Sequence, residues 1–444
     1  MTITPSYTNK MNLTVKQSLT IKPSKTTPCH TIWCSNLDLV VGRIHIQTVY
    51  FYRPNGSSNF FDSEVLKTTL ADVLVSFYPM SGRLGKDGDG RIEIVCNGEG
   101  VLFVEAEADC CIDDFGEITP SPELGRLAPT VDYSGDISSY PLFVTQVTRF
   151  KCGGVSLGSA LHHTLADGLS ALHFINTWSD KARGLTVAVP PFVDRTLLRA
   201  RDPPTPMFDH VEYHQPPSMI APLENQKSTS DPKSASTMML RLTLDQINDL
   251  KSKAKGDGSA YHSTYEILAA HIWRCACKAR GLSDDQPTKL YVATDGRSRL
   301  NPPLPRGYLG NVIFTATPIM KVGEFKSESL GDTARRIHNE LGIMNDQYLR
   351  SAIDYLESIT DLSTLVRGSS YFASPNLNVN SWTRLPIYDS DFGWGRPIFM
   401  GPASILYEGT IYILPSPGVD RSVALAVCLD PDHMALFKER LYDF

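Results

Sequence analysis

The sequence predicts two domains of mixed α and β structure, separated by a long linker. The chain has 444 residues, and a single hydrophobic core stops growing at roughly 250–300 residues. Runs with the period of a strand and runs with the period of a helix occur in both halves, which is the pattern of an α/β fold. Residues 202–237 between them are rich in proline and polar residues and have no sustained apolar period. We therefore expect an N-terminal domain over residues 1–201, a crossover linker over 202–237 and a C-terminal domain over 238–444.

The first half combines predicted strands with a predicted helix. Residues Ile44–Tyr52, IHIQTVYFY, are β-branched and aromatic and end at a Pro-Asn-Gly turn, which predicts a strand. Apolar residues recur at helical spacing from Ser63 to Phe77, and the following Tyr-Pro pair ends that helix. Between Gly90 and Glu107 the runs RIEIV and GVLFVEA predict two short strands.

The second half begins with a helix signal and continues with helices and strands. Thr243 and Gln246 have the spacing of a capping box, and an apolar stripe follows them to a helix end near Gly256. A longer amphipathic helix is expected over Ser263–Arg280. Strands are predicted over Leu290–Thr294, Val312–Ala316, Ile405–Leu414 with a turn at Glu408-Gly409, and Val423–Leu429.

Composition excludes several classes of protein. The net charge is −6 and no long run of Lys and Arg occurs, so a nucleic-acid partner is not expected. The nine cysteines have no two-pair spacing of a zinc site, so no bound metal is expected. The amino-terminal segment has no apolar run of the length of a secretory signal, and no segment has the ~18 apolar residues of a membrane span. We expect a cytoplasmic protein that acts on small molecules.

A His-rich junction carries the strongest chemical signal. In GGVSLGSALHHTLADGLSALHFINTW a strand pattern changes into a helix pattern, and His163 lies at the end of the strand. An imidazole has an ordinary pKa of about 6.5 and can take a proton near neutral pH. Deprotonating an alcohol during acyl transfer requires such a group, so His163 is the candidate general base.

Two neighbouring residues leave alternatives open. Asp167 lies four residues after His163 and could orient its imidazole, cap the following helix or pair with a distant arginine. Ser156 lies in Gly-Val-Ser-Leu-Gly, which matches the nucleophile elbow of serine hydrolases. That elbow needs a sharp turn directly before a helix, whereas the strand alternation here continues through Leu161, so Ser156 is expected in mid-strand on the face opposite His163.

HHTLADG together with DFGWG at Asp391–Gly395 resembles the BAHD family of plant coenzyme-A-dependent acyltransferases. The resemblance covers essentially the whole chain, including SNLDLVVGRIHIQTVYFYRPNGSSNFFD, ATDGRSRL, GYLGNV and NLNVNSWTRLPIYDSDFGWG. It implies two chloramphenicol-acetyltransferase-like domains, a channel between them with His163 in its middle, and a ternary complex without a covalent acyl-enzyme. Within the family the chain is similar to hydroxycinnamoyl transferases that use shikimate or quinate, and it looks closer to the quinate-using branch.

The resemblance also implies residues that support the site. It makes Asp167 the partner of Arg297 in ATDGRSRL, an ion pair that would fix the loop carrying His163. It places Asp391 and Trp394 away from the reacting atoms, as supports for the domain interface and the channel.

Further residues match positions that contact substrate in the family. Trp382 matches the tryptophan whose indole N–H donates to the oxyanion, and Arg367 matches the arginine that binds the acceptor's carboxylate. Thr48 and Tyr50 match positions near the phenolic end of the acyl group. Asn380 stands where shikimate-type enzymes tend to have threonine, and it offers both a donor and an acceptor for the additional hydroxyl of quinate.

The expected function is transfer of a caffeoyl or p-coumaroyl group from coenzyme A to a hydroxyl of quinate, which gives a chlorogenic-acid-type ester. Coenzyme A enters as the donor substrate, with no bound cofactor, and a monomer is expected. Shikimate as the preferred acceptor is the alternative within this class. A serine esterase with Ser156 as nucleophile, or a non-catalytic relative that keeps the fold as a binding module, are the alternatives outside it.

Overall fold

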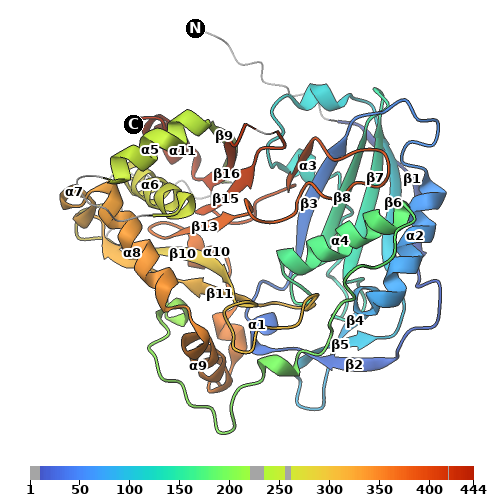
Figure 1. Ribbon diagram of the computed structural model, residues 1–444, viewed down its shortest axis with the longest axis horizontal. Helices are drawn as coiled ribbons and strands as arrows, with labels where there is room; N and C mark the ends of the chain where they lie inside the picture. Colours follow the sequence, from blue (N-terminus) through green and yellow to red (C-terminus); the bar gives the residue numbers. More distant parts are fainter. Residues whose placement is uncertain (1–10, 221–234, 256–261, 419) are drawn as a thin grey trace.

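The computed structural model describes residues 11–220, 235–255, 262–418 and 420–444. The two halves of the chain form two neighbouring bodies, each built on a mixed sheet with helices packed against it (Figure 1). This confirms the expected α/β class. Within the described residues, none of the helices is long and apolar enough to cross a membrane.

The sheet of the first body has the order β1-β6-β7-β8-β3-β14, in which β6 and β7 are parallel and the other pairs are antiparallel. Its strands are β1 (Leu13–Ile21), β6 (Val101–Ala108), β7 (Phe143–Phe150), β8 (Val155–His162), β3 (His45–Tyr52) and β14 (Phe399–Pro402). A second, three-stranded sheet consists of β2 (His30–Trp33), β5 (Ile92–Cys96) and β4 (Arg83–Lys86). The predicted strand over Ile44–Tyr52 is thus β3, and the runs RIEIV and GVLFVEA form β5 and β6.

Two helices, α2 (Ser63–Ser76) and α4 (Gly168–Ala182), pack side by side on the first sheet (Figure 1). Trp178 of α4 is fully buried between them, and its indole N–H donates to the Leu66 carbonyl at 3.2 Å. The opposite face of the sheet carries a smaller apolar cluster that includes Val49 and Phe51. The short helices α1 (Asn36–Leu39) and α3 (Pro122–Gly125) lie in the loops around this body.

The sheet of the second body has the order β11-β10-β13-β15-β16-β9, with β12 also paired to β10. Its strands are β11 (Ile313–Ala316), β10 (Pro287–Asp295), β13 (Leu377–Ser381), β15 (Thr410–Pro415), β16 (Val423–Leu429), β9 (Ser236–Leu242) and β12 (Ile319–Lys321). Its helices are α5 (Leu244–Lys255), α6 (Thr264–Ala279), α7 (Glu324–Ser327), α8 (Leu330–Ile343), α9 (Asp346–Glu357), α10 (Ser369–Phe372) and α11 (Pro431–Leu441).

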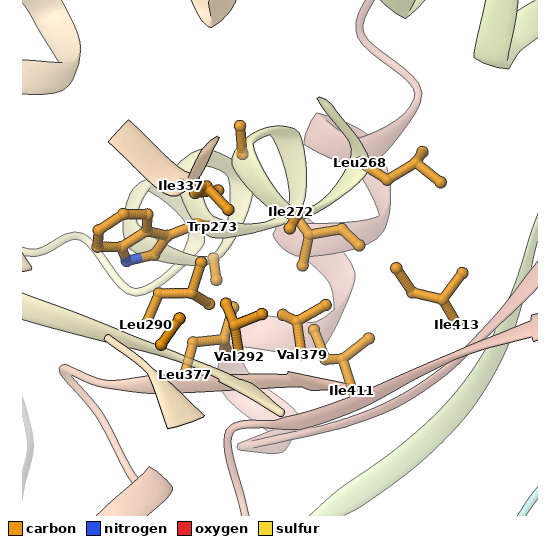
Figure 2. Close-up of a cluster of buried hydrophobic side chains, with 14 of the residues drawn as sticks. Leu268, Ile272, Trp273, Leu290, Val292, Ile337, Leu377, Val379, Ile411 and Ile413 are labelled. Carbon is orange, nitrogen blue, oxygen red and sulfur yellow. The ribbon is translucent and has the colours of Figure 1, made fainter. Parts of the chain in front are cut away.

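Helix α6 is buried over one face of this sheet. Alternate residues of the strands, among them Leu290, Val379 and Ile411, point toward Ile272 and Trp273 of α6 (Figure 2). The polar atom of Trp273 is satisfied, because its Nε1 donates to Thr288 Oγ1 at 3.0 Å. Because one face of the sheet packs against α6, the other face can carry polar and aromatic side chains.

The predicted start of α5 is confirmed by its hydrogen bonds. Thr243 N donates to Gln246 Oε1 at 2.9 Å, and Gln246 N donates to Thr243 Oγ1 at 3.3 Å. The helix runs to Lys255, and the predicted end at Gly256 lies outside the described residues.

The turn predicted at Glu408-Gly409 is confirmed, with Gly409 at a φ of 82°, and β15 begins directly after it at Thr410. The strand predicted before that turn, from Ile405, was wrong. The preceding residues instead form a loop in which the Glu408 carboxylate accepts from Arg280 Nη2 at 2.7 Å and from Ser374 N at 2.9 Å.

The described part of the predicted linker is anchored to α9. Asp354 accepts hydrogen bonds from Thr205 and from Arg201, which directly precedes the linker, and Ser351 Oγ lies 2.8 Å from His210 Nε2. At its other end, β9 begins at Ser236, so the last two residues of the expected linker belong to a strand.

The two bodies are joined by more than this linker. β14 follows the second body's β13 in sequence, yet it pairs with β3 in the first sheet, with Gly401 opposite Val49. Phe392, just upstream, packs on Tyr52 and Trp178 of the first body. The 238–444 region therefore completes the first sheet and part of its core.

Candidate active site

His163 directly follows β8 at the junction between the two bodies. Its backbone N–H donates to the Ile44 carbonyl at 2.9 Å, and its carbonyl accepts from Asn311 Nδ2 at 2.8 Å. Because side chains alternate between the two faces of a strand, His163 lies on the same face of the first sheet as Ser159 of β8, which pairs with Thr48 of β3. Both backbone groups of the candidate base are thus fixed, one from each body.

One nitrogen of the imidazole is left without a partner. His163 Nδ1 is buried, and no described residue forms a hydrogen bond with it. Burial lowers the pKa of His163, and this effect outweighs the opposite influence of its own backbone, of Asp167 and of the Asn311 side chain. The ring is therefore neutral at pH 7 and can accept a proton.

Asp167 is bound to Arg297, the partner expected for it. Arg297 Nη1 and Nη2 donate to the two carboxylate oxygens at 2.8 and 3.0 Å, and the backbone N–H groups of Ser170 and Val312 add bonds of 3.0 and 3.1 Å. Burial alone would raise the pKa of Asp167, but the Arg297 guanidinium and these hydrogen bonds hold it below its ordinary value. Neither carboxylate oxygen forms a hydrogen bond with the His163 ring among the described residues.

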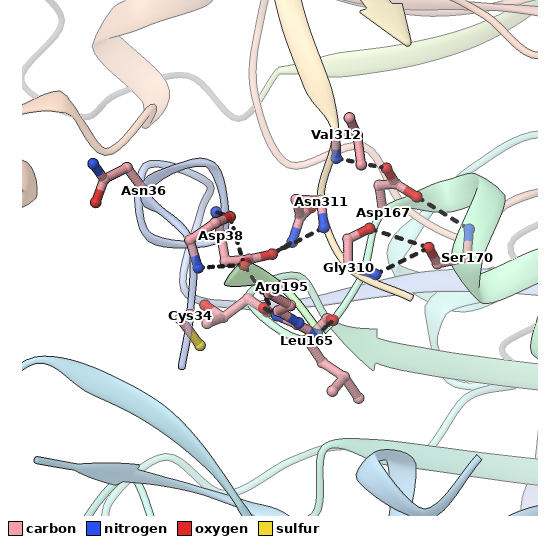
Figure 3. Close-up of polar contacts among 12 residues, drawn as sticks. Cys34, Asn36, Asp38, Leu165, Asp167, Ser170, Arg195, Gly310, Asn311 and Val312 are labelled. Carbon is pink, nitrogen blue, oxygen red and sulfur yellow. Dashed lines mark hydrogen bonds and ion pairs between the residues drawn. The ribbon is translucent and has the colours of Figure 1, made fainter. Parts of the chain in front are cut away.

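A second buried network, centred on Asp38, was not found from the sequence. Asp38 Oδ1 accepts from both the backbone N–H and the Nδ2 of Asn311 at 2.9 Å, while Oδ2 accepts from Ser35 Oγ at 2.7 Å and lies 3.1 Å from Arg195 Nη1 (Figure 3). Asp38 is fully buried. Because the same Asn311 amide also holds the His163 carbonyl, the network reaches the loop of the candidate base.

Arg195 holds the next two residues of that loop. Its Nη1 and Nη2 donate to the carbonyls of Thr164 and Leu165 at 3.3 and 2.5 Å. The loop from His163 to Asp167 is therefore bound through Asn311 and Arg195 near its start and through Arg297 at its end. The only sequence indication of Asp38, Arg195 and Asn311 is that they lie in the segments SNLDLVVG, PPFVDRTLLRARDPP and GYLGNV. These segments carry the family resemblance but contain no motif with a recognised role.

The free face of the second sheet presents Asn380 and Trp382. Tyr291 of β10 pairs with Asn378 of β13, and Asn380 pairs with Tyr412 of β15. Residues two apart on a strand share a face, so Asn378 and Asn380 point away from α6, and Trp382 continues this alternation just past the strand. The Trp382 ring packs edge-on against Tyr412 at 5.1 Å and also contacts the core of the first body.

Arg367 lies over the same face. Its Nη1 donates to Thr315 Oγ1 at 2.5 Å, and its guanidinium lies 5.8–6.0 Å from the ring centres of Tyr213, Tyr291 and Tyr371. Among the described residues, its recorded partners are this hydroxyl and these three rings, and none is a carboxylate. Arg367 is thus a cation that aromatic rings position without neutralising it.

The expected acyl-binding pair and the alternative nucleophile lie on opposite faces of the first sheet. Thr48 is half-buried and Tyr50 is 1% exposed within the core beneath α2 and α4, so Thr48 offers the more accessible surface. Ser156 pairs with Phe51 on the other face, fully buried, and its Oγ has no hydrogen-bond partner among the described residues. This placement gives no support to an esterase in which Ser156 and His163 act together.

The DFGWG motif forms its own turn and docks on the first body. Asp391 Oδ1 accepts from the backbone N–H of Gly393 at 2.8 Å and of Gly395 at 2.9 Å. Both glycines have positive φ, 99° and 109°, which an L side chain rarely adopts. The turn projects Trp394 onto Phe61, with ring centres 5.1 Å apart.

A cavity of about 420 Å³ opens beside Trp382, on the α6 side of the sheet. Ser381 and Thr383, the two neighbours of Trp382, line it together with Lys251 and Arg421. The cavity and the Asn380 face therefore lie on opposite sides of β13, near the end of the strand that precedes Trp382. No sequence signal marked Lys251 or Arg421, because they lie far apart along the chain.

Together, these features place the candidate base His163 at the junction of two mixed-sheet bodies. The model of the family described as "Transferase family" matches residues 11–444. A shikimate O-hydroxycinnamoyltransferase of Nicotiana tabacum is 57% identical over 435 residues, which cover 98% of this chain and 100% of the relative. The chain belongs to this family, the BAHD acyltransferases, which use coenzyme A thioesters as donors and need no further cofactor.

Solved structures show the same two-body fold. Vinorine synthase superposes with a TM-score of 0.74 at 23% identity, covering 96% of each chain. An F. graminearum protein, TRI101, solved with coenzyme A and T-2 mycotoxin, superposes with a TM-score of 0.71 at 19% identity, covering 91% of this chain and 96% of that one. The expected acyltransferase fold is therefore confirmed.

Proposed function

We propose that the protein transfers a hydroxycinnamoyl group from its coenzyme A thioester to a hydroxyl of quinate, with His163 as general base. The observation that carries the proposal is the state of His163: its backbone is fixed from both bodies, its Nδ1 has no hydrogen-bond partner among the described residues, and burial keeps the ring neutral. A binding module would have no need of an uncommitted base held in this way. The 57% identity to a hydroxycinnamoyltransferase supports the acyl group.

In the proposed reaction, His163 takes the proton of the acceptor's hydroxyl as its oxygen attacks the thioester carbonyl carbon. The tetrahedral intermediate carries its negative charge on the former carbonyl oxygen, and the indole N–H of Trp382 donates a hydrogen bond to it. Collapse breaks the carbon–sulfur bond, and the protonated His163 returns its proton to the departing thiolate. Asp167, Arg297, Asp391 and Trp394 act in this scheme as structural supports.

The donor is proposed to occupy the cavity beside Trp382. Lys251 and Arg421 supply two positive charges for the phosphates, and Ser381 and Thr383 supply hydroxyls next to the oxyanion donor. The acyl group would then extend past His163 toward Thr48 and Tyr50. Donor and acceptor thus approach from the two sides of the β13 end, which suits a ternary complex.

The acceptor is proposed to bind on the Asn380 face of the second sheet. Arg367 donates to Thr315 and has no carboxylate partner in the described part of the chain, so the carboxylate of a cyclic acid can bind it. Asn380 lies half-buried on the same face and can both donate to and accept from the additional hydroxyl of quinate. The relative from Nicotiana tabacum is named for shikimate, so shikimate is the competing acceptor.

We also propose that the protein is a monomer and is located in the reducing cytosol. All nine cysteines are free, which fits this location.

The test is an acceptor panel with the purified protein. Thiol release and ester formation would be measured with caffeoyl-CoA and p-coumaroyl-CoA, with quinate, shikimate or no acceptor. We expect thiol release only with an acceptor and a higher kcat/KM for quinate. Thiol release that is equal without acceptor would indicate a hydrolase, no release at all would indicate a binding module, and preference for shikimate would overturn the quinate assignment alone.

A further inference from the structure

A group of three metal-ligating side chains lies on the second body, in a place that the acyl-transfer scheme does not use. His262, Glu266 and His338 each offer one ligand atom, and these atoms all lie within 4.8 Å of one another. His262 precedes α6, Glu266 is in its first turn, and His338 is in α8. Two imidazoles and one carboxylate form a ligand set that proteins use for zinc.

The arrangement is close to the geometry that a metal requires. With bonds of about 2.0–2.1 Å, neighbouring ligand atoms of a tetrahedral zinc site lie about 3.3 Å apart. Glu266 Oε1 and His338 Nδ1 are 3.0 Å apart, so this pair already has a suitable spacing. Glu266 Oε2 is bound separately, accepting from Ser263 N at 2.6 Å, and this cap bond holds the carboxylate in place.

The two histidines have the freedom to complete the site. His262 is 9% exposed, and its buried Nδ1 has no hydrogen-bond partner among the described residues, although buried polar atoms are normally paired. The His338 side chain is 56% exposed and can turn toward the other two ligands, whereas that of Glu266 is 9% exposed. This group differs from a surface ion pair in having a buried, pre-positioned carboxylate beside an imidazole whose Nδ1 has no partner among the described residues.

We propose that His262, Glu266 and His338 bind one divalent metal ion of the zinc type, with water in the remaining position. The ion would link the start of α6 to α8. Thr264 and Tyr265, in the same turn as Glu266, line the cavity assigned to the donor, and Tyr265 Oη donates to the Val379 carbonyl in β13 at 2.9 Å. The ion would therefore brace one wall of that cavity without entering the reaction.

The test is a titration of the metal-free, full-length protein with zinc chloride, followed by calorimetry and by thermal unfolding. We expect one tight site per chain and a Tm that rises with zinc concentration, because the ion binds the folded state. His338→Ala should weaken this site by at least about 10–100-fold, since even the outer partners of metal ligands contribute that much. Glu266→Gln keeps an oxygen for the Ser263 cap and should weaken zinc binding with little change in the metal-free Tm.

His214→Ala is the matched control, because His214 is also exposed and paired with a carboxylate, Asp209, but lies outside the cluster. It should bind zinc as the wild type does. The exposed Cys29 and Cys152 remain in every variant, so any binding by thiols contributes equally. Cobalt substitution adds a second readout, since tetrahedral coordination gives visible absorption that His338→Ala should lose. Absence of a tight site in the wild type, or equal affinity in wild type and His338→Ala, would overturn the proposal.

Discussion

Replacing Asp167 by asparagine tests whether this carboxylate acts on the loop or on the imidazole of His163. Asp167 is 1% exposed and accepts two bonds from Arg297, and backbone bonds occupy the same oxygens. Breaking a buried ion pair by removing one partner typically costs about 3–5 kcal/mol. Asparagine keeps one oxygen and Arg297 keeps Asp295 at 2.9 Å, so we expect a loss near the lower end, about 3 kcal/mol of unfolding free energy at pH 7.

The dependence of this loss on pH follows from the lowered pKa of Asp167. A carboxylate whose folded pKa lies below its unfolded value of about 3.9 stabilises the fold above that value, and the stabilisation disappears as pH falls through the folded pKa. The difference in unfolding free energy between wild type and Asp167→Asn should therefore be full at pH 6–7 and shrink below about pH 4. Urea unfolding followed by tryptophan fluorescence at a series of pH values measures it.

Measurements of kcat/KM can refute the structural role of Asp167. If Asp167 acts only through Arg297, then Asp167→Asn and Arg297→Gln should lower kcat/KM by similar factors, and the double variant should lose little more than either single variant. A catalytic dyad predicts a different pattern. A loss of about 10²-fold or more in Asp167→Asn, with Arg297→Gln close to wild type, would refute the structural role and assign Asp167 to the chemistry.

Four further predictions concern the reaction. His163→Ala should lower kcat by about 10²–10⁴-fold with an unchanged circular dichroism spectrum, whereas Ser156→Ala should keep most activity; the reverse pattern would establish the esterase. Because burial lowers the pKa of His163, kcat/KM should hold as pH falls to about 6.5 and drop only below it, and a profile that drops above pH 7 would contradict a neutral buried base. Arg367→Ala should lower kcat/KM for both quinate and shikimate by the equivalent of about 1.5–3 kcal/mol, and an unchanged KM for both would remove it from the acceptor site. Asn380→Thr should shift the quinate-to-shikimate ratio of kcat/KM toward shikimate, and an unchanged ratio would show that another residue discriminates.

Local patterns predicted the elements that carry the candidate base. The alternation through Leu161 and the helical spacing after Gly168 predicted β8, α4 and the position of His163 between them, because side-chain periodicity is a local property of strands and helices. β7 was missed for a physical reason. Its buried residues include Thr145, Gln146 and Thr148, so a central strand with polar side chains showed no apolar alternation.

Long-range contacts were beyond local patterns. Asn311 bonds to Asp38 across 273 residues and to His163 across 148 residues, and nothing in the segment around Asn311 indicates either partner. The Asp167–Arg297 pair, by contrast, was expected, because a family motif marked both ends. The metal-type cluster of His262, Glu266 and His338 likewise depends on α6 and α8 packing together, which composition and spacing do not reveal.

The pairing of β14 with β3 has a consequence for synthesis on the ribosome. When the first 201 residues have emerged, β3 is still an unpaired sheet edge, and the places of Phe392 and Trp394 beside Phe61 are unfilled. An exposed sheet edge next to an incomplete apolar core invites association with other chains. The sheet of the first body is therefore complete only after residues 399–402, near the end of the chain, have been synthesised. Fragments that end at the linker should need a chaperone or a separately supplied second half to stay dispersed.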